Sequence, residues 1–279
     1  GLIHVTRDGG KTWTNITPKD MPDLGRVSQI DASQFDAGTA YVAVKRPLFD
    51  DFAPYIFRTH DFGKTWTKTV SGIPANDYVH VVREDPTRQG LLYAGTEHGF
   101  YISYDDGDHW QSLRLNLPDT QVSDIWIHRN DIAISTMERG FYILDDIGAL
   151  RQYGPDAVAA SAAWLFKPGD AIHGAEPATI EYWLKQPAKS MTLDILDGAG
   201  KVIRSYKGVE PKAKADEDDE DEGPRGGPAG PSMAAGLNHF AWDLRYDGVV
   251  KFPGMVLWGA TTNGPMALPG TYQVRMVVD

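Results

Sequence analysis

The chain contains three copies of a short turn pattern, Ser/Thr-x-Asp-x-Gly-x-x-Trp, each placed next to β-prone residues. The copies occupy residues 6–13, 59–66 and 103–110, so their Trp residues are 53 and 44 residues apart. A recurrence of this size is typical of repeat architectures in which each unit is a small sheet that cannot bury its faces alone. The repeat therefore predicts a row of small sheets that pack against one another.

The residue types of the pattern predict a hairpin turn. The Asp can accept backbone N–H groups inside the turn, and the Gly tolerates a positive φ because it has no Cβ. The Trp begins the returning strand and offers a large apolar face to a neighbouring sheet. We therefore assign structural roles to the Asp, Gly and Trp of each copy, namely Asp8, Gly10, Trp13, Asp61, Gly63, Trp66, Asp105, Gly107 and Trp110.

This pattern resembles the Asp-box, or BNR repeat, of the β-propellers of sialidases, xyloglucan-degrading glycosidases and sortilin-type receptors. The segments Leu91–Gly107 and Arg139–Ile147 are similar to one bacterial group of such proteins, labelled glycosyl-hydrolase-like or sortilin-like. Residues 240–246 and 268–272 extend this resemblance into the last part of the chain. The resemblance implies a propeller followed by an immunoglobulin-like (Ig-like) sandwich, in an extracytoplasmic protein that is periplasmic or secreted.

The pattern divides the all-β chain into a propeller segment, a linker and a sandwich. Residues 1–153 predict the C-terminal part of a β-propeller, with about three to four four-stranded blades; the last blade lacks an Asp-box, and its outer strand is Leu150–Tyr153 or comes from elsewhere. An Ala-rich linker is expected at 154–177. Residues 178–279 predict the Ig-like β-sandwich, with a disordered acidic insertion at 210–232 whose composition cannot bury enough apolar surface.

Both ends of the chain predict a segment of a longer protein. The first strand already leads into an Asp-box, and the last strand, residues 272–278, has nothing after it. A propeller needs four or more blades to close. We therefore expect the remaining blades to come from missing upstream sequence or from another chain. No signal peptide is visible, and a segment without its beginning could not show one.

Composition argues against several classes of function. The net charge is −11, but residues 216–222 supply seven acids, which leaves 31 acids against 27 bases and no basic patch for nucleic acid. The absence of Cys excludes disulfides and thiolate metal sites. The eight His residues never show zinc-site spacing, so we expect no metal and no cofactor. No apolar run is long enough to span a membrane.

Propeller topology predicts where a ligand would bind. The Asp-boxes join the third and fourth strands at one face, whereas the loops between second and third strands open on the opposite face. The connection at 45–53 mixes aromatic and charged residues, which suits a binding lip. The predicted ligand contacts on this face are Arg46, Asp50, Asp51, Asp77, His98 and Arg139.

Carboxylates on this face are the candidates for catalysis. Glycoside cleavage needs two of them, roughly 5 Å apart for retention or roughly 6.5–9.5 Å apart for inversion. Glu97 and Glu138 follow corresponding second strands in adjacent blades, so both should face the same opening, and we predict them as the catalytic pair. The alternative is that each Glu belongs to a turn held by local hydrogen bonds and water.

Two functions of different classes stay open at this point. The first is an exported, glycan-directed propeller, either a glycoside hydrolase or a relic of one, with a carbohydrate ligand. The second is a non-enzymatic scaffold that binds peptide or protein as sortilin-type receptors do. A second acid that faces Glu97 or Glu138 across the opening would favour the enzyme.

Overall fold

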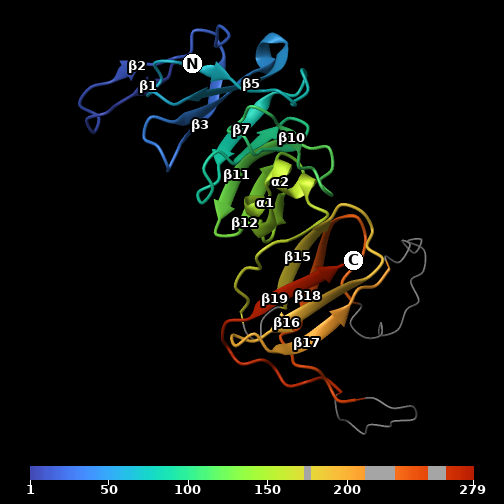
Figure 1. Ribbon diagram of the computed structural model, residues 1–279. Helices are drawn as coiled ribbons and strands as arrows, with labels where there is room; N and C mark the ends of the chain where they lie inside the picture. The colour runs from blue at the N-terminus through green and yellow to red at the C-terminus, as the bar shows by residue number, and fades with distance from the viewer. Residues whose placement is uncertain (173–176, 211–229, 251–261) are drawn as a thin grey trace. The chain divides into compact units, whose positions relative to one another are not determined.

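A computed structural model describes residues 1–172, 177–210, 230–250 and 262–279 (Figure 1). The chain separates into two compact units, Gly1–Ile147 and Gly148–Asp279. Nearly all of its regular structure is antiparallel β-sheet. No helix among the described ranges has the length and apolar character needed to cross a bilayer.

The first unit consists of four small sheets in chain order, which we call blades 1 to 4 (Figure 1). Blade 1 holds β1 (His4–Val5) and β2 (Thr14–Asn15). The longer blades are blade 2, with β3 (Arg26–Ala32), β4 (Ala40–Arg46), β5 (Asp51–Thr59) and β6 (Thr67–Lys68); blade 3, with β7 (Val79–Glu84), β8 (Leu92–Thr96), β9 (Phe100–Ser103) and β10 (Gln111–Ser112); and blade 4, with β11 (Val122–His128), β12 (Asp131–Thr136) and β13 (Phe141–Leu144).

These sheets confirm the predicted all-β, partial Asp-box propeller. Blades 2 and 3 each have four strands that follow one another from one edge to the other, as the sequence predicts. One expectation is wrong: Leu150–Tyr153 does not form the outer strand of blade 4, because the chain enters helix α1 (Gly148–Gln152) instead. No Asp-box follows β13, so blade 4 lacks the turn that returns the chain as a fourth strand in blades 2 and 3.

The predicted binding lip is also more regular than expected. Strand β4 continues to Arg46 and β5 begins at Asp51, so the connection between them is the short 3₁₀ helix η1 (Pro47–Phe49) and Asp50. Asp50 has a left-handed backbone (φ 55°), and its N–H donates to Pro47 O at 3.1 Å. The connection is thus a tight hairpin that projects the η1 side chains from the end of blade 2.

The three Asp-boxes share one hydrogen-bond arrangement. In the second, the Thr59 hydroxyl donates to Asp61 Oδ1 and accepts the Gly63 N–H, both at 2.9 Å. Asp61 also accepts the Thr65 N–H at 2.9 Å and the Thr65 hydroxyl at 2.7 Å. The corresponding bonds in the other boxes join Thr6, Asp8, Gly10 and Thr12, and Ser103, Asp105, Gly107 and His109.

These bonds hold the Asp carboxylates in the ionised form. Hydrogen bonds from the Thr12 side chain and backbone lower the pKa of Asp8 to about 2. Hydrogen bonds from the Thr65 backbone and side chain do the same for Asp61. Both pKa values lie below the ordinary value of 3.8. The bonds therefore stabilise the folded state fully above pH 3.8, and this stabilisation is lost as the pH falls towards about 2.

The glycine of the Asp-box is needed for both conformation and packing. Gly63 has φ of 79°, in the left-handed region that side chains with a Cβ rarely adopt. A Cβ at this position would also lie 2.5 Å from the Ile16 side chain of blade 1. The second Asp-box therefore touches the preceding blade directly.

The Trp side chains connect consecutive blades. Trp66 Nε1 donates to Ile16 O in blade 1 at 2.6 Å, and Trp110 Nε1 donates to Thr69 O at the end of blade 2 at 3.0 Å. Trp110 is 4% exposed and belongs to an apolar cluster formed by blades 2 and 3. Trp13 has the same place in the repeat, but it is 61% exposed and therefore packs little against other residues.

The second unit is built from two three-stranded sheets that share one apolar core. It begins with α1 and α2 (Pro155–Ala160). The strands are β14 (Ala163–Leu165), β15 (Ala178–Leu184) and β18 (Gly236–Trp242) in one sheet, and β17 (Val202–Lys207), β16 (Met191–Leu196) and β19 (Gln273–Val278) in the other. The core includes Tyr182 and Phe240 from the first sheet and Leu193, Ile195 and Tyr206 from the second.

Two features of this unit bear on the predicted layout. Strand β14 lies inside residues 154–177, which the sequence assigns to a linker, and pairs with β15. Most of the predicted acidic insertion, 211–229, lies outside the described residues. The Ig-like assignment of the sandwich stays a prediction.

The different packing of two equivalent Trp residues gives a test of the blade assignment. We expect Trp110→Ala to lower the free energy of unfolding of the first unit by about 3–5 kcal/mol, because it removes a buried aromatic side chain. The exposed control, Trp13→Ala, should change it by only about 0.5 kcal/mol. Urea unfolding followed by far-UV circular dichroism measures both, and equal losses would contradict the blade-to-blade packing described above.

Candidate functional site

The Asp-boxes and the candidate site lie at opposite ends of the same strands. At one end of blade 3, Ser103, the first residue of an Asp-box, pairs with Leu92 at the start of β8. At the other end, Thr96 closes β8 opposite Val79, and Glu97 follows it directly. Glu97 therefore projects from the end of the blade that is remote from the Asp-box.

Three charged or titratable side chains from two blades form a hydrogen-bonded chain at this end. Lys45 near the end of β4 contacts His80 of β7, with 2.8 Å between Nζ and Nδ1. His80 Nε2 in turn lies 2.9 Å from Glu97 Oε2. His80 is 5% exposed and Glu97 29% exposed, so the chain runs from the interface between blades 2 and 3 to the surface.

The chemistry of the partners fixes the protonation of His80. A Lys ammonium group has donors only, so Nδ1 must accept and carry no proton. The proton of the neutral ring then lies on Nε2 and is donated to the Glu97 carboxylate. This arrangement orders Lys45, His80 and Glu97 as donor, relay and acceptor.

The pKa values of the cluster agree with a neutral imidazole. Burial lowers the pKa of His80, and the charge of Lys45 lowers it further, while Glu97 acts in the opposite direction. Burial also lowers the pKa of Lys45, and the nearby Arg26 adds to that effect. Arg26 and Lys45 are directly opposite each other in the β3–β4 pairing, where two like charges repel.

A row of aromatic side chains begins at the Glu97 carboxylate. The Tyr78 hydroxyl hydrogen-bonds Glu97, and burial together with this bond raises the pKa of Tyr78 to about 12. The Tyr78 ring lies 5.0 Å from the His80 ring and 6.1 Å from the Phe52 ring, measured between centroids. Phe52 is 47% exposed, so this row of rings ends at the surface.

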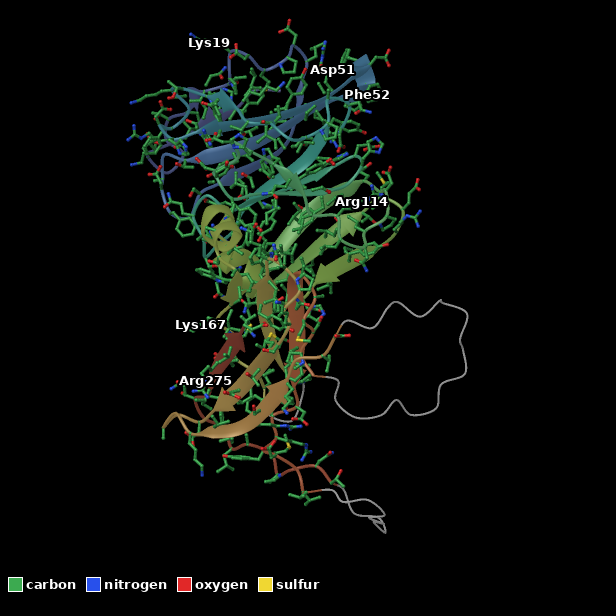
Figure 2. All side chains as sticks on the ribbon, turned by 45° about the vertical axis from the view of Figure 1, so that its right-hand side comes forward. Lys19, Asp51, Phe52, Arg114, Lys167 and Arg275 are labelled. Carbon is green, nitrogen blue, oxygen red and sulfur yellow. The ribbon has the colours of Figure 1, made fainter. Side chains whose placement is uncertain are left out.

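The β4–β5 hairpin adds an apolar and partly charged edge to this cluster. Leu48 and Phe49 of η1 are 90% and 51% exposed. Arg46 forms an ion pair with Asp51 at 3.4 Å and stacks over the Phe49 ring at 5.1 Å. Figure 2 shows Asp51 and Phe52 beside this short helix.

Asp51 is held as an acceptor within this hairpin. It accepts hydrogen bonds from the Tyr55 hydroxyl at 3.0 Å and from the Ala53 N–H at 3.2 Å. Desolvation raises the pKa of Asp51, but the bonds from Ala53, Tyr55 and Arg46 outweigh it and lower the pKa. The predicted contacts Arg46 and Asp51 therefore pair with each other.

Two further predicted contacts organise the turn between β8 and β9. Asp77 is 1% exposed and accepts hydrogen bonds from the Thr96 and Tyr101 hydroxyls, each at 2.9 Å, and from the His98 N–H at 3.0 Å. The exposed His98 ring contacts Asp119 at 3.1 Å. Asp77 thus fixes the turn that presents Glu97.

The structure shows no contact between Glu97 and Glu138, the two residues that the sequence predicts as the catalytic pair. Glu138 and Arg139 lie on the exposed turn between β12 and β13, where Thr136 bonds the Arg139 N–H and the Gly140 carbonyl. Among the described residues, no hydrogen bond or ion pair connects either side chain with Glu97. The catalytic role of Glu97 and Glu138 stays a prediction.

Sequence reasoning missed His80, the residue at the centre of the cluster. The available signal was the spacing of two residues between Tyr78, which immediately precedes β7, and His80 within β7. Lys45, however, belongs to a different blade, and no sequence pattern relates the end of one blade to the start of the next. The cluster depends on how blades 2 and 3 pack.

Comparisons with known proteins agree with this architecture. Residues 1–140 match the family model described as "Sortilin, neurotensin receptor 3". The "Vacuolar protein sorting/targeting protein 10" of Colletotrichum graminicola is 31% identical over 100 residues, which is 34% of this chain and 6% of that protein. The chain thus spans a small part of this curated relative.

Solved structures with partial similarity include two further proteins. "YCF48 bound to D1 peptide" has a TM-score of 0.38 and 14% identity, and the match covers 68% of this chain and 57% of that one. The GH74 enzyme of Niastella koreensis has a TM-score of 0.36 and 12% identity, over 66% of this chain and 32% of that one.

The neutral state of His80 predicts a pH dependence of stability. In the unfolded chain His titrates near 6.5, whereas the folded protein resists protonation until a lower pH. As the pH falls below about 6.5, the unfolded state binds more protons, so the free energy of unfolding should fall by up to about 1.4 kcal/mol per pH unit. Urea unfolding of the wild type at pH 7.5 and pH 5 measures this loss.

The matched variants are His80→Gln and His128→Gln, the second at an exposed position of β11. His80→Gln should show a smaller difference between the two pH values than the wild type, because the buried titrating group is gone. His128→Gln should behave as the wild type does. If all three proteins lose the same stability at pH 5, His80 is not held neutral by its surroundings.

Proposed function

Because the chain belongs to the Sortilin-Vps10 family, whose model matches residues 1–140, we propose that its propeller is a ligand-binding domain. The proposed ligand is a peptide or protein segment, bound at the blade ends remote from the Asp-boxes. The description of the family model names a receptor, and the Colletotrichum relative is named a protein sorting/targeting protein.

The observation that carries this proposal is the like-charge pair formed by Arg26 and Lys45. The two residues are opposite each other at one end of blade 2. Arg26 is exposed and has no ion-pair partner within the described residues. The Lys45 ammonium group donates one N–H to His80 Nδ1 and has two further N–H groups to donate. An anionic group of a ligand would relieve this repulsion and accept from both side chains, as a carboxylate does.

The surroundings of this pair favour a peptide as the source of the anion. Leu48, Phe49 and Phe52 expose apolar surface on the neighbouring hairpin. Exposed aromatic and aliphatic side chains beside charged groups are typical of protein-binding surfaces, where apolar anchors provide affinity and charges provide orientation. A peptide with an apolar side chain near a carboxylate would satisfy both parts.

The hydrolase hypothesis has less support from the geometry. Glu97 already accepts from His80 and Tyr78, and within the ranges that the structure describes no second carboxylate shares these bonds. A glycosidase would need a pair of carboxyl groups on either side of the scissile bond. We keep glycan cleavage as the second hypothesis, and an extracytoplasmic location as part of the proposal, in line with the sorting role in the name of the Vps10 relative.

Substitution at the charged pair tests the proposal. Peptides selected from a random library on the 279-residue chain should carry a carboxylate next to an apolar residue. A selected peptide should bind Lys45→Met about 10-fold or more weakly, since charge-assisted hydrogen bonds contribute about 1.5–3 kcal/mol. Isothermal titration calorimetry measures the affinities.

The control is Lys64→Met, which removes the same charge from an exposed position in the Asp-box of the same blade. It should bind the selected peptide as the wild type does. Equal affinity of the wild type and Lys45→Met, or selection of peptides without an acidic group, would contradict the proposed site.

Glycan turnover provides the second test. If the propeller only binds its ligand, the chain should release no sugar from a panel of polysaccharides, and Glu97→Gln should change nothing in that assay. Reducing-sugar release that is present in the wild type and lost in Glu97→Gln would establish the hydrolase instead.

A further inference from the structure

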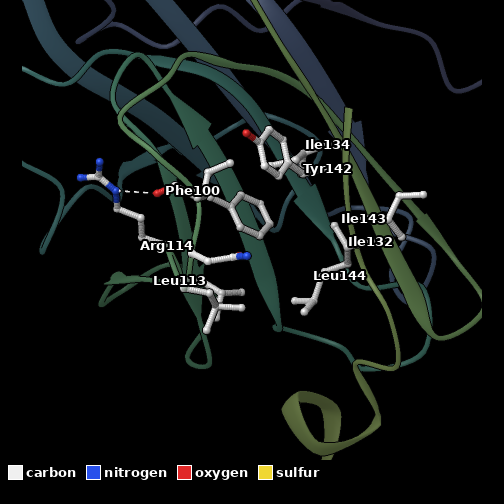
Figure 3. Close-up of a pocket in the computed structure, with 11 residues that line it drawn as sticks. Phe100, Leu113, Arg114, Ile132, Ile134, Tyr142, Ile143 and Leu144 are labelled. Carbon is white, nitrogen blue, oxygen red and sulfur yellow. Dashed lines mark hydrogen bonds between the residues drawn. The ribbon is translucent and has the colours of Figure 1, made fainter. Parts of the chain in front are cut away.

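An apolar pocket of about 60 Å³ lies between blades 3 and 4 (Figure 3). One wall is the loop 113–117 after β10, which Arg114 closes by donating from Nε to Leu117 O at 2.9 Å. The side chains around the pocket include Phe100, Leu113, Ile132, Ile134, Tyr142 and Leu144.

The loop that lines this pocket has an equivalent after each preceding blade. In each case a backbone N–H at the end of the blade donates to a carbonyl of the same blade: Ile16 to Ile3, Thr69 to Ile56 and Leu113 to Phe100, at 2.8, 2.9 and 2.8 Å. Each loop then reaches an apolar residue followed by Pro, namely Met21-Pro22, Ile73-Pro74 and Leu117-Pro118. Ile16, Thr69 and Leu113 are therefore corresponding positions.

The first two of these positions receive a Trp from the following blade. Trp66 Nε1 donates to Ile16 O, and Trp110 Nε1 donates to Thr69 O. By the same repeat, a Trp of blade 4 would donate to Leu113 O and enter the pocket. Among the described residues no Trp takes this position, because Arg151 occupies the corresponding place in the sequence.

The edge of blade 4 beside the pocket is also without a strand. Residues 140–143, Gly-Phe-Tyr-Ile, repeat residues 99–102. In blade 3 this segment pairs with β10, through Ile102 with Gln111 and Tyr101 with Ser112. Its counterpart β13 pairs with β12 and has no strand on its other side in the described part of the chain.

We propose that the pocket and the outer edge of β13 together bind an extended polypeptide segment that carries a Trp residue. The segment would run antiparallel to β13 and pair with Ile143 and Tyr142, as β10 pairs with Ile102 and Tyr101. Its Trp would enter the pocket and donate from Nε1 to Leu113 O. Main-chain bonds along the edge would provide affinity, and the pocket would select the aromatic side chain.

Continuity with the two filled positions identifies the occupant. The same loop geometry accepts Trp twice in this chain, and in both cases the Trp is followed by a strand of two residues on the edge of the blade. Phe141 and Ile143 are 80% and 65% exposed, so the edge strand also carries apolar surface that an added strand would partly cover. This site uses blades 3 and 4 and does not depend on the Lys45 cluster.

A synthetic peptide that copies residues 108–115 tests the proposal, because it contains Trp110 and the β10 sequence. Fluorescence anisotropy should show saturable binding of the labelled peptide to the 279-residue chain. The same peptide with Ala in place of its Trp should bind at least about 10-fold more weakly, as expected for loss of an aromatic anchor. No binding, or equal binding of the two peptides, would overturn the proposal.

Two variants of the edge strand make the test specific. By the alternation of an antiparallel pair, the Ile143 N–H faces the open edge, so Ile143→Pro removes that donor and leaves the pairing with β12. Binding should fall at least about 10-fold in Ile143→Pro and stay unchanged in Ile143→Val. Binding that is insensitive to Ile143→Pro would overturn the site. A dimer in sedimentation experiments that Ile143→Pro abolishes would instead assign the edge to a second copy of the chain.

Discussion

The first unit depends on the indole N–H bonds that Trp66 and Trp110 make to the preceding blade. A buried indole needs an acceptor for its single donor, and the carbonyls of Ile16 and Thr69 supply it. The Trp stands at the start of the fourth strand, directly after the Asp-box turn. The Asp carboxylate fixes the turn, the turn fixes the Trp, and the Trp fixes the spacing between blades. Local and tertiary structure are thus coupled through one side chain.

This coupling determines what can be assembled at the other end of the blades. Lys45 belongs to blade 2, whereas His80 and Glu97 belong to blade 3, so their hydrogen bonds require a fixed distance between the two sheets. The Asp-box end provides that rigidity and carries no part of the cluster itself. The opposition of Arg26 and Lys45 costs stability, and the rigid blades hold it in place.

The sequence predicts what is local and misses what crosses between blades. The Asp-boxes, the strands of blades 2 and 3 and the remote position of Glu97 all follow from turn chemistry and strand alternation. His80 is missed because its role comes from Lys45 of the preceding blade. Asp77 is predicted as a ligand contact, whereas in the structure it is buried and bonded by Thr96, Tyr101 and His98 in a turn. The pairing of Arg46 with Asp51 also requires the observed hairpin, in which β4 ends and β5 begins inside the connection that the sequence places at 45–53.

Blade 4 shows how much of a blade the Asp-box itself specifies. Its third strand has the same Gly-Phe-Tyr-Ile sequence as that of blade 3, and both form on the strength of this apolar, β-prone run. After it, Leu144 stands where blade 3 has Ser103, so the hydroxyl that accepts the Gly N–H is absent. Without that bond and without a Trp to anchor, the chain turns into α1 instead of a fourth strand. The third strand therefore needs only its own residues, whereas the fourth needs the box, and loss of the box turns an internal packing position into an accessible pocket.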